Sequence, residues 1–348
     1  MVAMGNKVVY YYRYYKGLTK KIRIHTIIRQ NEREKMEQET QIKQRVIDEI
    51  GKAVIGKEEV IIKAFATILA GGHILFEDIP GVGKTTMAMA ISKVLSLQYN
   101  RLQFTTDVMP SDVLGYSLYN KEAGVMQYKK GVIMCNLFLA DEINRTSSKT
   151  QSALLEAMEE GRVTVDGKTM ELPTPFTVIA TQNPTGSAGT TLLPDSQLDR
   201  FMVKLSMGYP TKKDEINILK SKFGGKNPLE DIEKVLTAEE IIEIKKQVSN
   251  IYVHDAMYDY IVDIVNATRN TELLDVGISP RGTVALINMA KAIAFMNNRN
   301  YIIPEDVQYV FLSVCSHRVI LSQKARLAKM KEDQVLIEIA KQISVIRA

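Results

Sequence analysis

The chain of 348 residues is long enough for one large domain and a smaller one, and its composition, with 45% hydrophobic and 24% charged residues, is typical of a globular protein. The net charge of +5 is uneven, because residues 1–35 carry nine basic and two acidic side chains, whereas the remainder carries 36 basic and 38 acidic ones. The near-neutral body argues against a nucleic-acid partner, and no apolar run is long enough for a membrane span.

Residues 1–35 interleave tyrosines with arginines and lysines, without a sustained helical or strand period. Such a segment could stack on single-stranded nucleic acid or lie on an anionic membrane surface. The weak pattern favours a third interpretation, a disordered extension or an upstream stretch added by a misassigned start codon. No secretory signal is recognisable, and the isolated Cys135 and Cys315 are typical of buried thiols in a reducing, cytoplasmic compartment.

From Met36 to about residue 210 the hydrophobic spacing alternates between helical and strand periods. The predicted helices are Gln41–Ile50, Lys57–Ala70, Thr85–Leu95 and Thr150–Glu160. The predicted strands are His73–Phe76, Asn100–Thr105, Asn136–Ala140 and Thr177–Ala180. Alternating residues around Asp166-Gly167 predict a hairpin at Arg162–Leu172. Strands that alternate with helices indicate a parallel sheet flanked by helices.

After residue 210 helical periods dominate to the end of the chain, and no strong strand is visible. Thr237 and Glu240 have the spacing of a capping box, and Pro304 suits the first turn of a helix. We therefore expect an N-terminal extension over residues 1–35, an α/β domain over 36–210 and a helical domain over 211–348.

The stretch EDIPGVGKTT, Glu77–Thr86, is close to a phosphate-binding loop. The pattern G-x-x-x-x-G-K-[ST] is intact from Gly83 to Thr85, but Asp78 stands where the first Gly is usual. Backbone N–H groups and the next helix would cradle phosphates, Lys84 would bind the β- and γ-phosphates, and the hydroxyl of Thr85 would bind Mg²⁺. Asp78 should be tolerated, because its carboxylate can accept hydrogen bonds from its own turn, and Asp78→Gly should tighten ATP binding by at most about tenfold.

Polar residues also follow two of the predicted strands. Asp141 and Glu142 come directly after Asn136–Ala140, where an Asp can hold Mg²⁺ through water and a Glu can activate the attacking water. Asn183 follows Thr177–Ala180, where an amide can hold that water or sense the γ-phosphate. Each feature also occurs in ordinary loops, so it is their order and spacing together that indicate an ATPase.

Two arginines complete the set of candidates. Arg200, in LPDSQLDRF, follows a short helical segment and would be available to the γ-phosphate of a neighbouring subunit. Arg281, in ISPRG, begins a helix of the second domain, and an ordinary surface arginine is the alternative interpretation.

Taken in order, these motifs resemble the MoxR family of AAA+ ATPases. The resemblance runs from about Met36 to residue 320 through VIGKEEV, PGVGKT, LADEINRTSSKTQSALLEAMEEG, ATQNP, LPDSQLDRF, SPRG and PEDV. It implies an α/β fold, a P-loop AAA+ core with a parallel five-stranded sheet flanked by helices, followed by a C-terminal all-α lid domain. It also implies a helix-2 insert at Val108–Gly131, and it makes Arg162–Leu172 the hairpin before sensor 1.

The resemblance also implies roles for single residues. Asn183 would be sensor 1, Arg200 the arginine finger and Arg281 sensor 2, with Glu142 as the catalytic Walker B glutamate. The implied ATP- and Mg²⁺-binding residues are Ile55 and Gly56 at the adenine, Pro80, Gly81, Val82, Gly83, Lys84, Thr85 and Thr86 of Walker A, and Asp141 of Walker B. The loop PTGSAGTTLLPD, residues 184–195, departs from the family pattern E-G-T-[YF]-P-L-P, because it lacks the acidic and aromatic residues often found there.

The same resemblance implies a ring, usually a homo-hexamer, that remodels a client protein in a chaperone-like way, often a protein with a von Willebrand A domain. Two other functions remain open from the sequence. A nucleic-acid motor shares the insert and the hairpin, but the near-neutral body disfavours it. A nucleotide-gated scaffold would bind ATP and hardly hydrolyse it, and Glu142 disfavours this alternative, because a scaffold needs no water-activating glutamate.

Overall fold

The computed structural model describes residues 42–122, 124–183, 193–225 and 227–343. The described residues from Arg45 onward form one compact unit. The predicted extension over residues 1–35 and most of the unusual loop at 184–195 therefore lie outside the described residues. None of the helices in the described part of the chain is both long and apolar enough to cross a bilayer.

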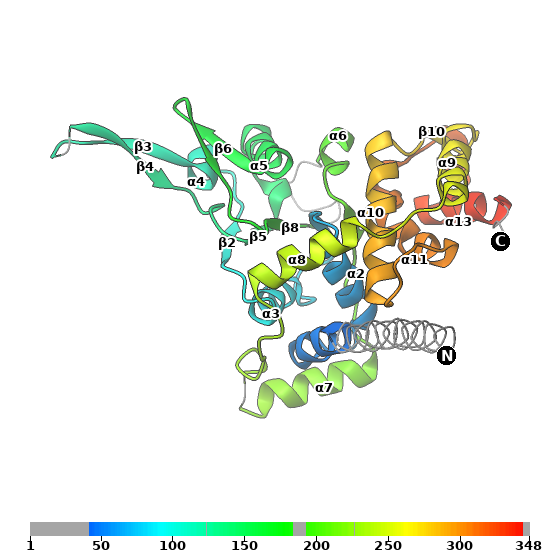
Figure 1. Ribbon diagram of the computed structural model, residues 1–348, viewed down its shortest axis with the longest axis horizontal. Helices are drawn as coiled ribbons and strands as arrows, with labels where there is room; N and C mark the ends of the chain where they lie inside the picture. Colours follow the sequence, from blue (N-terminus) through cyan, green and yellow to red (C-terminus); the bar gives the residue numbers. More distant parts are fainter. Residues whose placement is uncertain (1–41, 123, 184–192, 226, 344–348) are drawn as a thin grey trace, which may run out of the picture. The chain divides into compact units, whose positions relative to one another are not determined.

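Five parallel strands form the central sheet (Figure 1). In spatial order they are β2 (Tyr99–Gln103), β5 (Leu137–Asp141), β8 (Thr177–Gln182), β1 (Ile74–Glu77) and β9 (Val203–Leu205). Four of them were located from the hydrophobic pattern. The fifth, β9, has only three residues and is too short for its alternation to be recognised.

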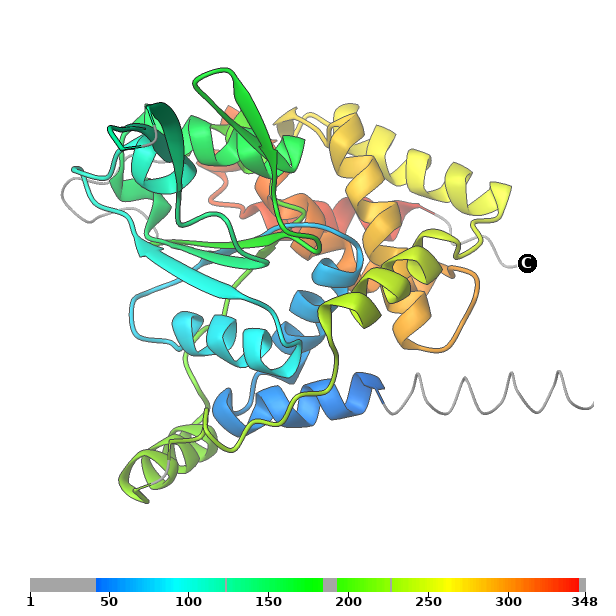
Figure 2. The ribbon, with the colours of Figure 1, turned by 60° about the vertical axis from the view of Figure 1, so that its left-hand side comes forward.

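Helices cover both faces of the sheet, with α5 on one face and α2 and α3 on the other (Figure 2). The helical segments of this part are residues 42–53, α2 (Glu58–Leu69), α3 (Lys84–Val94), α4 (Pro110–Leu114), η1 (Ile143–Arg145), α5 (Ser148–Glu160) and α6 (Asp195–Leu198). α5 begins where the hydroxyl of Ser147 accepts a hydrogen bond from the amide of Thr150, and it ends at Gly161, whose φ is 65°.

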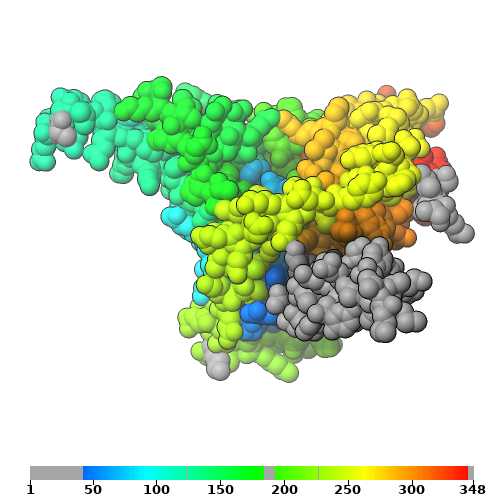
Figure 3. All heavy atoms as spheres, in the orientation of Figure 1, coloured from blue at the N-terminus to red at the C-terminus, as the bar shows by residue number. Residues whose placement is uncertain are grey.

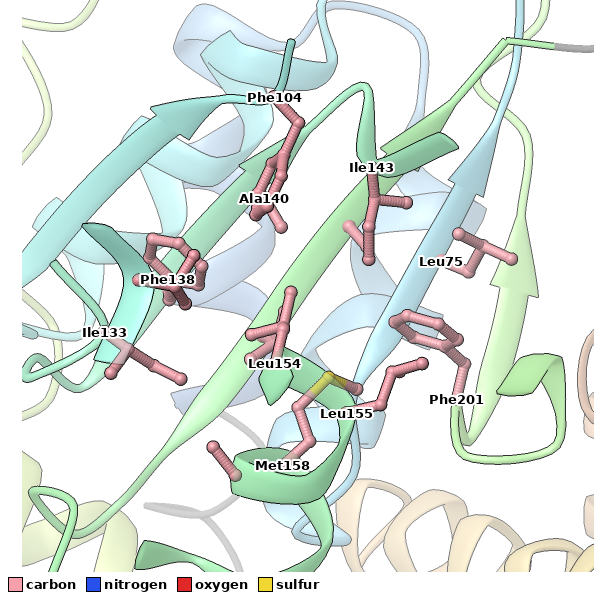
Figure 4. Close-up of a cluster of buried hydrophobic side chains, with 14 of the residues drawn as sticks. Leu75, Phe104, Ile133, Phe138, Ala140, Ile143, Leu154, Leu155, Met158 and Phe201 are labelled. Atoms are coloured by element: carbon pink, nitrogen blue, oxygen red, sulfur yellow. The ribbon is translucent and has the colours of Figure 1, made fainter. Parts of the chain in front are cut away.

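Under α5 lies a continuous apolar core (Figure 4). Leu154, Leu155 and Met158 of α5 pack against side chains from the sheet, including Leu75 and Phe138, and all five are at most 5% exposed. Burying one such side chain contributes about 1.5–3 kcal/mol, so this layer fixes α5 firmly on the sheet. The last turn of α5, which this packing holds in place, carries Glu159.

Two antiparallel hairpins extend this part of the fold. The first joins β3 (Gly115–Asn120) to β4 (Val125–Lys130) within the predicted insert, and it reaches away from the sheet in Figures 1 and 3. The second joins β6 (Arg162–Val165) to β7 (Lys168–Glu171). Its turn places Asp166 and Gly167 at φ of 49° and 75°, which confirms the hairpin predicted from that dipeptide.

Helices dominate the rest of the chain, as predicted. They are α7 (Lys212–Phe223), α8 (Ala238–Ser249), α9 (Asp255–Arg269), α10 (Pro280–Met296), α11 (Pro304–Cys315), η2 (Ser316–Arg318), α12 (Gln323–Leu327) and α13 (Glu332–Gln342). The capping box of Thr237 and Glu240 is present. The sequence did not predict the small ribbon of β10 (Leu274–Val276) and β11 (Ile320–Leu321), whose strands of three and two residues give no readable alternation.

Candidate functional site

The P-loop connects β1 to α3, which is the strand–turn–helix context that its motif requires. Gly81 and Gly83 have φ of 85° and 97°, values that glycine adopts without steric cost. α3 begins at Lys84, so the unpaired amides of its first turn lie at the loop. A helix that begins directly behind a glycine turn favours an anion at this place.

Asp78 is 7% exposed, and its carboxylate accepts hydrogen bonds from four donors. Oδ1 accepts from the amide of Ile79 at 3.1 Å, within its own turn as predicted. Oδ2 accepts from the hydroxyl of Ser206 and the amides of Met207 and Gly208, which lie 128 to 130 positions later. Asp78 thus ties the start of the P-loop to the segment after β9, and its removal would leave these donors unpaired.

Lys84 and Asn183 connect the P-loop to Glu142. The Lys84 Nζ donates to the carbonyl oxygen of Asp78 at 2.8 Å and to Asn183 Oδ1 at 3.4 Å. Asn183 Nδ2 donates to Glu142 Oε1 at 3.1 Å. Burial lowers the pKa of the Lys84 amino group, and the nearby carboxylates oppose that shift. We refer to Lys84, Asp141, Glu142 and Asn183 as the P-loop cluster.

Asp141 and Glu142 follow one another, and both bond the hydroxyl of Thr181. Asp141 Oδ1 accepts from the hydroxyl of Thr181 at 2.6 Å, and its Oδ2 accepts from Arg101 at 2.7 Å. Glu142 has a left-handed backbone, with φ 57° and ψ 48°, and its amide donates to the same Thr181 hydroxyl at 2.9 Å. A non-glycine residue in this region is strained, and strained residues gather at functional sites.

Sequence reasoning missed three side chains that bind these carboxylates. Arg101 binds Asp141, whereas Gln103 and Arg145 both donate to Glu142 Oε2 at 2.7 Å. Arg101 and Gln103 are two residues apart on β2, so they lie on one face of the strand next to β5. The alternating polar residues of the predicted strand Asn100–Thr105 were the available signal.

Thr85 and Asp141 fit a magnesium ion that arrives with a nucleotide. Thr85 lies half-buried in the first turn of α3, and hydroxyl and carboxylate oxygens are the ligands that Mg²⁺ prefers. Proteins usually supply one or two such ligands and leave the remaining positions to phosphates and water. Across residues 42–343, leaving aside the undescribed positions, no cluster of His, Cys, Asp and Glu side chains is large enough to hold a metal alone.

Ile55 and Gly56 form a turn beside the start of α7. Gly56 has a φ of 72°, a left-handed value that glycine adopts without strain, and a Cβ added there would lie 2.3 Å from a carboxylate oxygen of Asp214. The next residue, Lys57, donates from Nζ to the carbonyl oxygens of Gly208 and Tyr209 at 3.3 Å and 3.0 Å. Because Gly208 also binds Asp78, this turn lies on the P-loop side of the molecule.

Arg200 and Arg281 both bind Glu159 in the last turn of α5. Arg200 Nε lies 3.0 Å from Glu159 Oε2, and Arg281 Nη2 forms an ion pair with Glu159 Oε1. Their side chains keep 30% and 44% of their surface exposed. We call Glu159, Arg200 and Arg281 the arginine cluster.

The arginine cluster lies at the amino ends of the strands. His73 immediately precedes β1, and its ring is bonded to the carbonyl oxygen of Met158 and the amide of Val178, while its own carbonyl accepts from the amide of Met202. Glu159 follows Met158 in the chain. The P-loop cluster lies instead at the carboxyl ends, and β1 alone spans roughly 13 Å between the two edges. The structure therefore divides the predicted site residues into two groups.

Arg318 fixes the helical part against the segment that carries Arg200. Its side chain is 2% exposed, and it donates to Asp199 Oδ1 at 2.8 Å and to the carbonyl oxygen of Phe201 at 2.7 Å. The hydroxyl of Ser279, directly before α10, donates to the same Asp199 carboxylate at 2.9 Å. The position of the arginine cluster thus depends on contacts between the sheet and the helical part.

A P-loop at the end of β1, acidic residues at the end of β5 and a following helical part together define an AAA-type ATPase. The family model for the "ATPase family associated with various cellular activities (AAA)" matches residues 73–203, and the AAA lid domain model matches residues 266–339. The chain belongs to the MoxR-type members of this family, and it is an ATPase that binds ATP.

Similar proteins span nearly the whole chain. YeaC of Bacillus subtilis, an uncharacterised protein, is 45% identical over 86% of this chain and 94% of its own length. Chaperone MoxR1 of Mycobacterium tuberculosis is 33% identical over 87% and 82%, and protein MoxR of Methylorubrum extorquens is 30% identical over 78% and 86%. A crystal structure from Cytophaga hutchinsonii, assigned as an ATPase, has a TM-score of 0.81 and 34% identity, covering 90% of this chain and 99% of the other.

Proposed function

We propose that this ATPase hydrolyses ATP at the subunit interfaces of a ring, expected to be a hexamer, and uses the cycle to remodel a partner protein. The observation that carries the proposal is the separation of the P-loop cluster from the arginine cluster. Arginines needed at the γ-phosphate would then come from a second copy of the chain. Head-to-tail repetition of such a contact closes a ring.

The P-loop edge would hold the nucleotide. In our proposal the loop from Pro80 to Thr86 wraps the phosphates, and Ile55 and Gly56 lie beside the adenine. Lys84 exchanges its bond to the Asp78 carbonyl oxygen for bonds to the β- and γ-phosphates. Thr85 and Asp141 hold Mg²⁺, which supplies positive charge at the phosphate oxygens.

Glu142 would accept the proton of the attacking water, and Asn183 would link it to the nucleotide. Asn183 contacts Glu142 through Nδ2 and Lys84 through Oδ1, so it is placed to sense a γ-phosphate on one side and to orient the carboxylate on the other. Gln103 and Arg145 hold the second oxygen of Glu142. General-base groups of this kind accelerate proton transfer by about 10²–10⁴-fold.

Arg200 and Arg281 would act in trans. Both form an ion pair with Glu159 in the single chain, and their exposed surface leaves them accessible to a neighbouring copy. In the ring they would stabilise the charge that develops on the γ-phosphate, Arg200 as the finger and Arg281 as the second sensor.

We further propose a protein client, in line with the name of the MoxR1 chaperone, and we expect it to carry a von Willebrand A domain. We place the boundary between the ATPase core and the lid near residue 210. Cys135 and Cys315 are both buried free thiols, which supports the expected cytoplasmic location. No nucleic-acid partner is expected.

Subunit mixing tests the shared site. Glu142→Gln, Arg200→Ala and Arg281→Ala should each lose steady-state ATPase alone, Arg200→Ala by about 10³-fold or more, while ATP affinity stays near that of the unchanged protein. Mixing either arginine variant with Glu142→Gln should restore activity, because some interfaces then pair an intact Glu142 with intact arginines. A mixture that forms rings yet stays inactive would contradict action in trans.

The same assay separates the alternatives. A nucleic-acid motor would be stimulated by single-stranded DNA, whereas a nucleotide-gated scaffold would bind ATP with hardly any turnover. We expect turnover without stimulation by DNA.

A further inference from the structure

α7 is an exposed helix with an apolar stripe. None of its twelve residues is buried. Ile216, Leu219 and Phe223 follow one another at spacings of three and four, so they lie on one face, and Phe223 keeps 82% of its surface exposed. Asp214 lies on the opposite face and contacts Gly56. The stripe therefore points away from the turn at Gly56.

The stripe on α7 is basic along its border. Lys212, Lys213 and Lys220 lie within about 60° of Ile216 on the helical wheel, at 3.6 residues per turn. All three are exposed, and none has an ion-pair partner among the residues that the structure describes. A surface that fits this helix should be apolar with an acidic border.

α9 carries such a surface. Tyr258 and Val262 are 45% exposed and four residues apart, and Asp255, Asp259 and Asp263 border them on the same outward side. Within the described part of the chain these three aspartates form no ion pair. α7 and α9 of one chain lie far apart in both Figure 1 and Figure 2, so they are not partners within the chain.

Each helix lies beside one of the two functional edges. α7 begins a few residues after Gly208, which binds Asp78 at the start of the P-loop. α9 ends at Arg269, whose Nε donates to the carbonyl oxygen of Ile278 at 2.9 Å, three residues before Arg281. A contact between α7 of one copy and α9 of the next would therefore bring the P-loop edge of the first toward the arginine edge of the second.

We propose that the apolar, basic face of α7 (Lys212, Lys213, Ile216, Leu219, Lys220 and Phe223) docks on the apolar, acidic face of α9 (Asp255, Tyr258, Asp259, Val262 and Asp263) of a second copy of this chain. The proposal rests on the trans-acting ring of the proposed function and names the surface that sets its register. The contact is heterologous, so it propagates head to tail. Opposite charges around an apolar centre give it both affinity and orientation.

Charge reversal tests the pairing. In a Glu142→Gln background, which keeps ATP bound, Lys213→Glu with Lys220→Glu should raise the protein concentration for half-assembly at least about tenfold, by sedimentation velocity. Asp259→Lys with Asp263→Lys should do the same. All four changes in one chain should restore assembly to within about threefold of the background, because the opposite charges face one another again. Lys234→Glu with Lys246→Glu changes the net charge equally outside both faces and should have little effect.

A disulfide test locates the contact directly. Chains with Leu219→Cys mixed with chains with Val262→Cys should form a disulfide-linked dimer on oxidation, whereas neither chain should do so alone. The two natural cysteines are buried and do not interfere. If α7 binds another protein or residues 1–35 of its own chain, the charge reversals leave ring sedimentation unchanged, and the docking proposal is wrong while the ring stands. If the unchanged protein stays monomeric with ATP, the ring itself is wrong.

Discussion

The two edges of the central sheet differ in how their charges are arranged. At the carboxyl ends of the strands the P-loop cluster is linked within one chain, from Lys84 through Asn183 to Glu142. At the amino ends Arg200 and Arg281 share one carboxylate, Glu159, and touch none of the P-loop cluster. The edge at the carboxyl ends carries the P-loop, whereas the edge at the amino ends carries two arginines that are paired with Glu159. In the proposed function, the single chain therefore carries two halves of a site, which a second copy completes.

The edges also differ in what positions them. The P-loop edge uses short segments that follow strand ends, so local sequence sets most of its geometry. The arginine edge draws on α5, the segment before β9 and the start of α10. Ser279 at the start of α10 and buried Arg318 both donate to Asp199 in that segment. A substitution that weakens the packing between these segments should therefore displace Arg200 and Arg281 more than it displaces the P-loop cluster.

The largest predicted effect comes from the same substitution at the two edges. Glu142→Gln should lower the steady-state ATPase rate by about 10²–10⁴-fold, because it removes the proton acceptor and keeps the shape of the side chain. Glu159→Gln should change the rate by no more than about threefold, because it only releases an exposed ion pair. Equal losses in the two variants would show that Glu159 is also needed for turnover.

Arg318→Met should destabilise the protein by about 3–5 kcal/mol, because it removes the cation paired with Asp199 and the donor to several buried carbonyl oxygens. Urea unfolding would measure the loss. Arg326→Met, at an exposed arginine of the same region, is the control and should cost well under 1 kcal/mol. If the two variants were equally stable, the buried hydrogen bonds of Arg318 would contribute nothing net.

His73 should make the arginine edge sensitive to acid. Its Nδ1 accepts from the amide of Val178 and its Nε2 donates to the carbonyl oxygen of Met158, so the ring is held neutral. Burial lowers the pKa of His73 to about 4, against 6.5 when unfolded. The unfolded chain therefore binds a proton first, and stability present above about pH 6.5 falls as the pH drops toward 4, by about 3 kcal/mol in total.

Urea unfolding at about pH 7 and about pH 5 would measure the loss of stability that results from protonation of His73. His73→Gln should lose stability at pH 7 and should show about 2 kcal/mol less change between the two pH values than the unchanged protein. His317, whose pKa burial also lowers, should leave a residual slope in the variant. If the free energy of unfolding of His73→Gln depended on pH as strongly as that of the unchanged protein, a group other than His73 would cause the acid sensitivity.

Substitution of Asp78 should have the smallest effect of the predicted changes. Asp78→Asn keeps the size of the side chain but turns an NH₂ group toward donors, so it should cost about 1–3 kcal/mol of stability. ATP should bind more weakly, because the carbonyl oxygen of Asp78 also positions Lys84. From the sequence we expected Asp78→Gly to tighten binding, and the four donors to its carboxylate reverse that direction. If either variant bound ATP more tightly than the unchanged protein in a titration, the carboxylate of Asp78 would weaken ATP binding, as we expected from the sequence.

The sequence predicted the P-loop edge well because each of its residues lies within a few positions of a recognisable strand end. Gly83, Lys84 and Asp141 needed only a local motif to be placed. The contacts of Arg101 and Gln103 with Asp141 and Glu142 were not predicted, because no local sequence signal shows that β2 pairs with β5. The bonds from residues 206–208 to Asp78 were missed for the same reason, since the partners lie far apart along the chain, whereas β9 was missed because it has only three residues.

By itself the sequence determined the family, the order of the main helices and strands of the α/β domain, and the chemistry of each candidate residue, because these depend on local periodicity and on side-chain type. Only the tertiary structure decided which candidates meet. It placed Arg200 and Arg281 together on Glu159, on the far edge from Lys84, because the direction of parallel strands assigns every strand start to one edge and every strand end to the other. The spacing along the chain does not reveal that division, since residues 183 and 200 are only 17 positions apart and lie on opposite edges of the sheet.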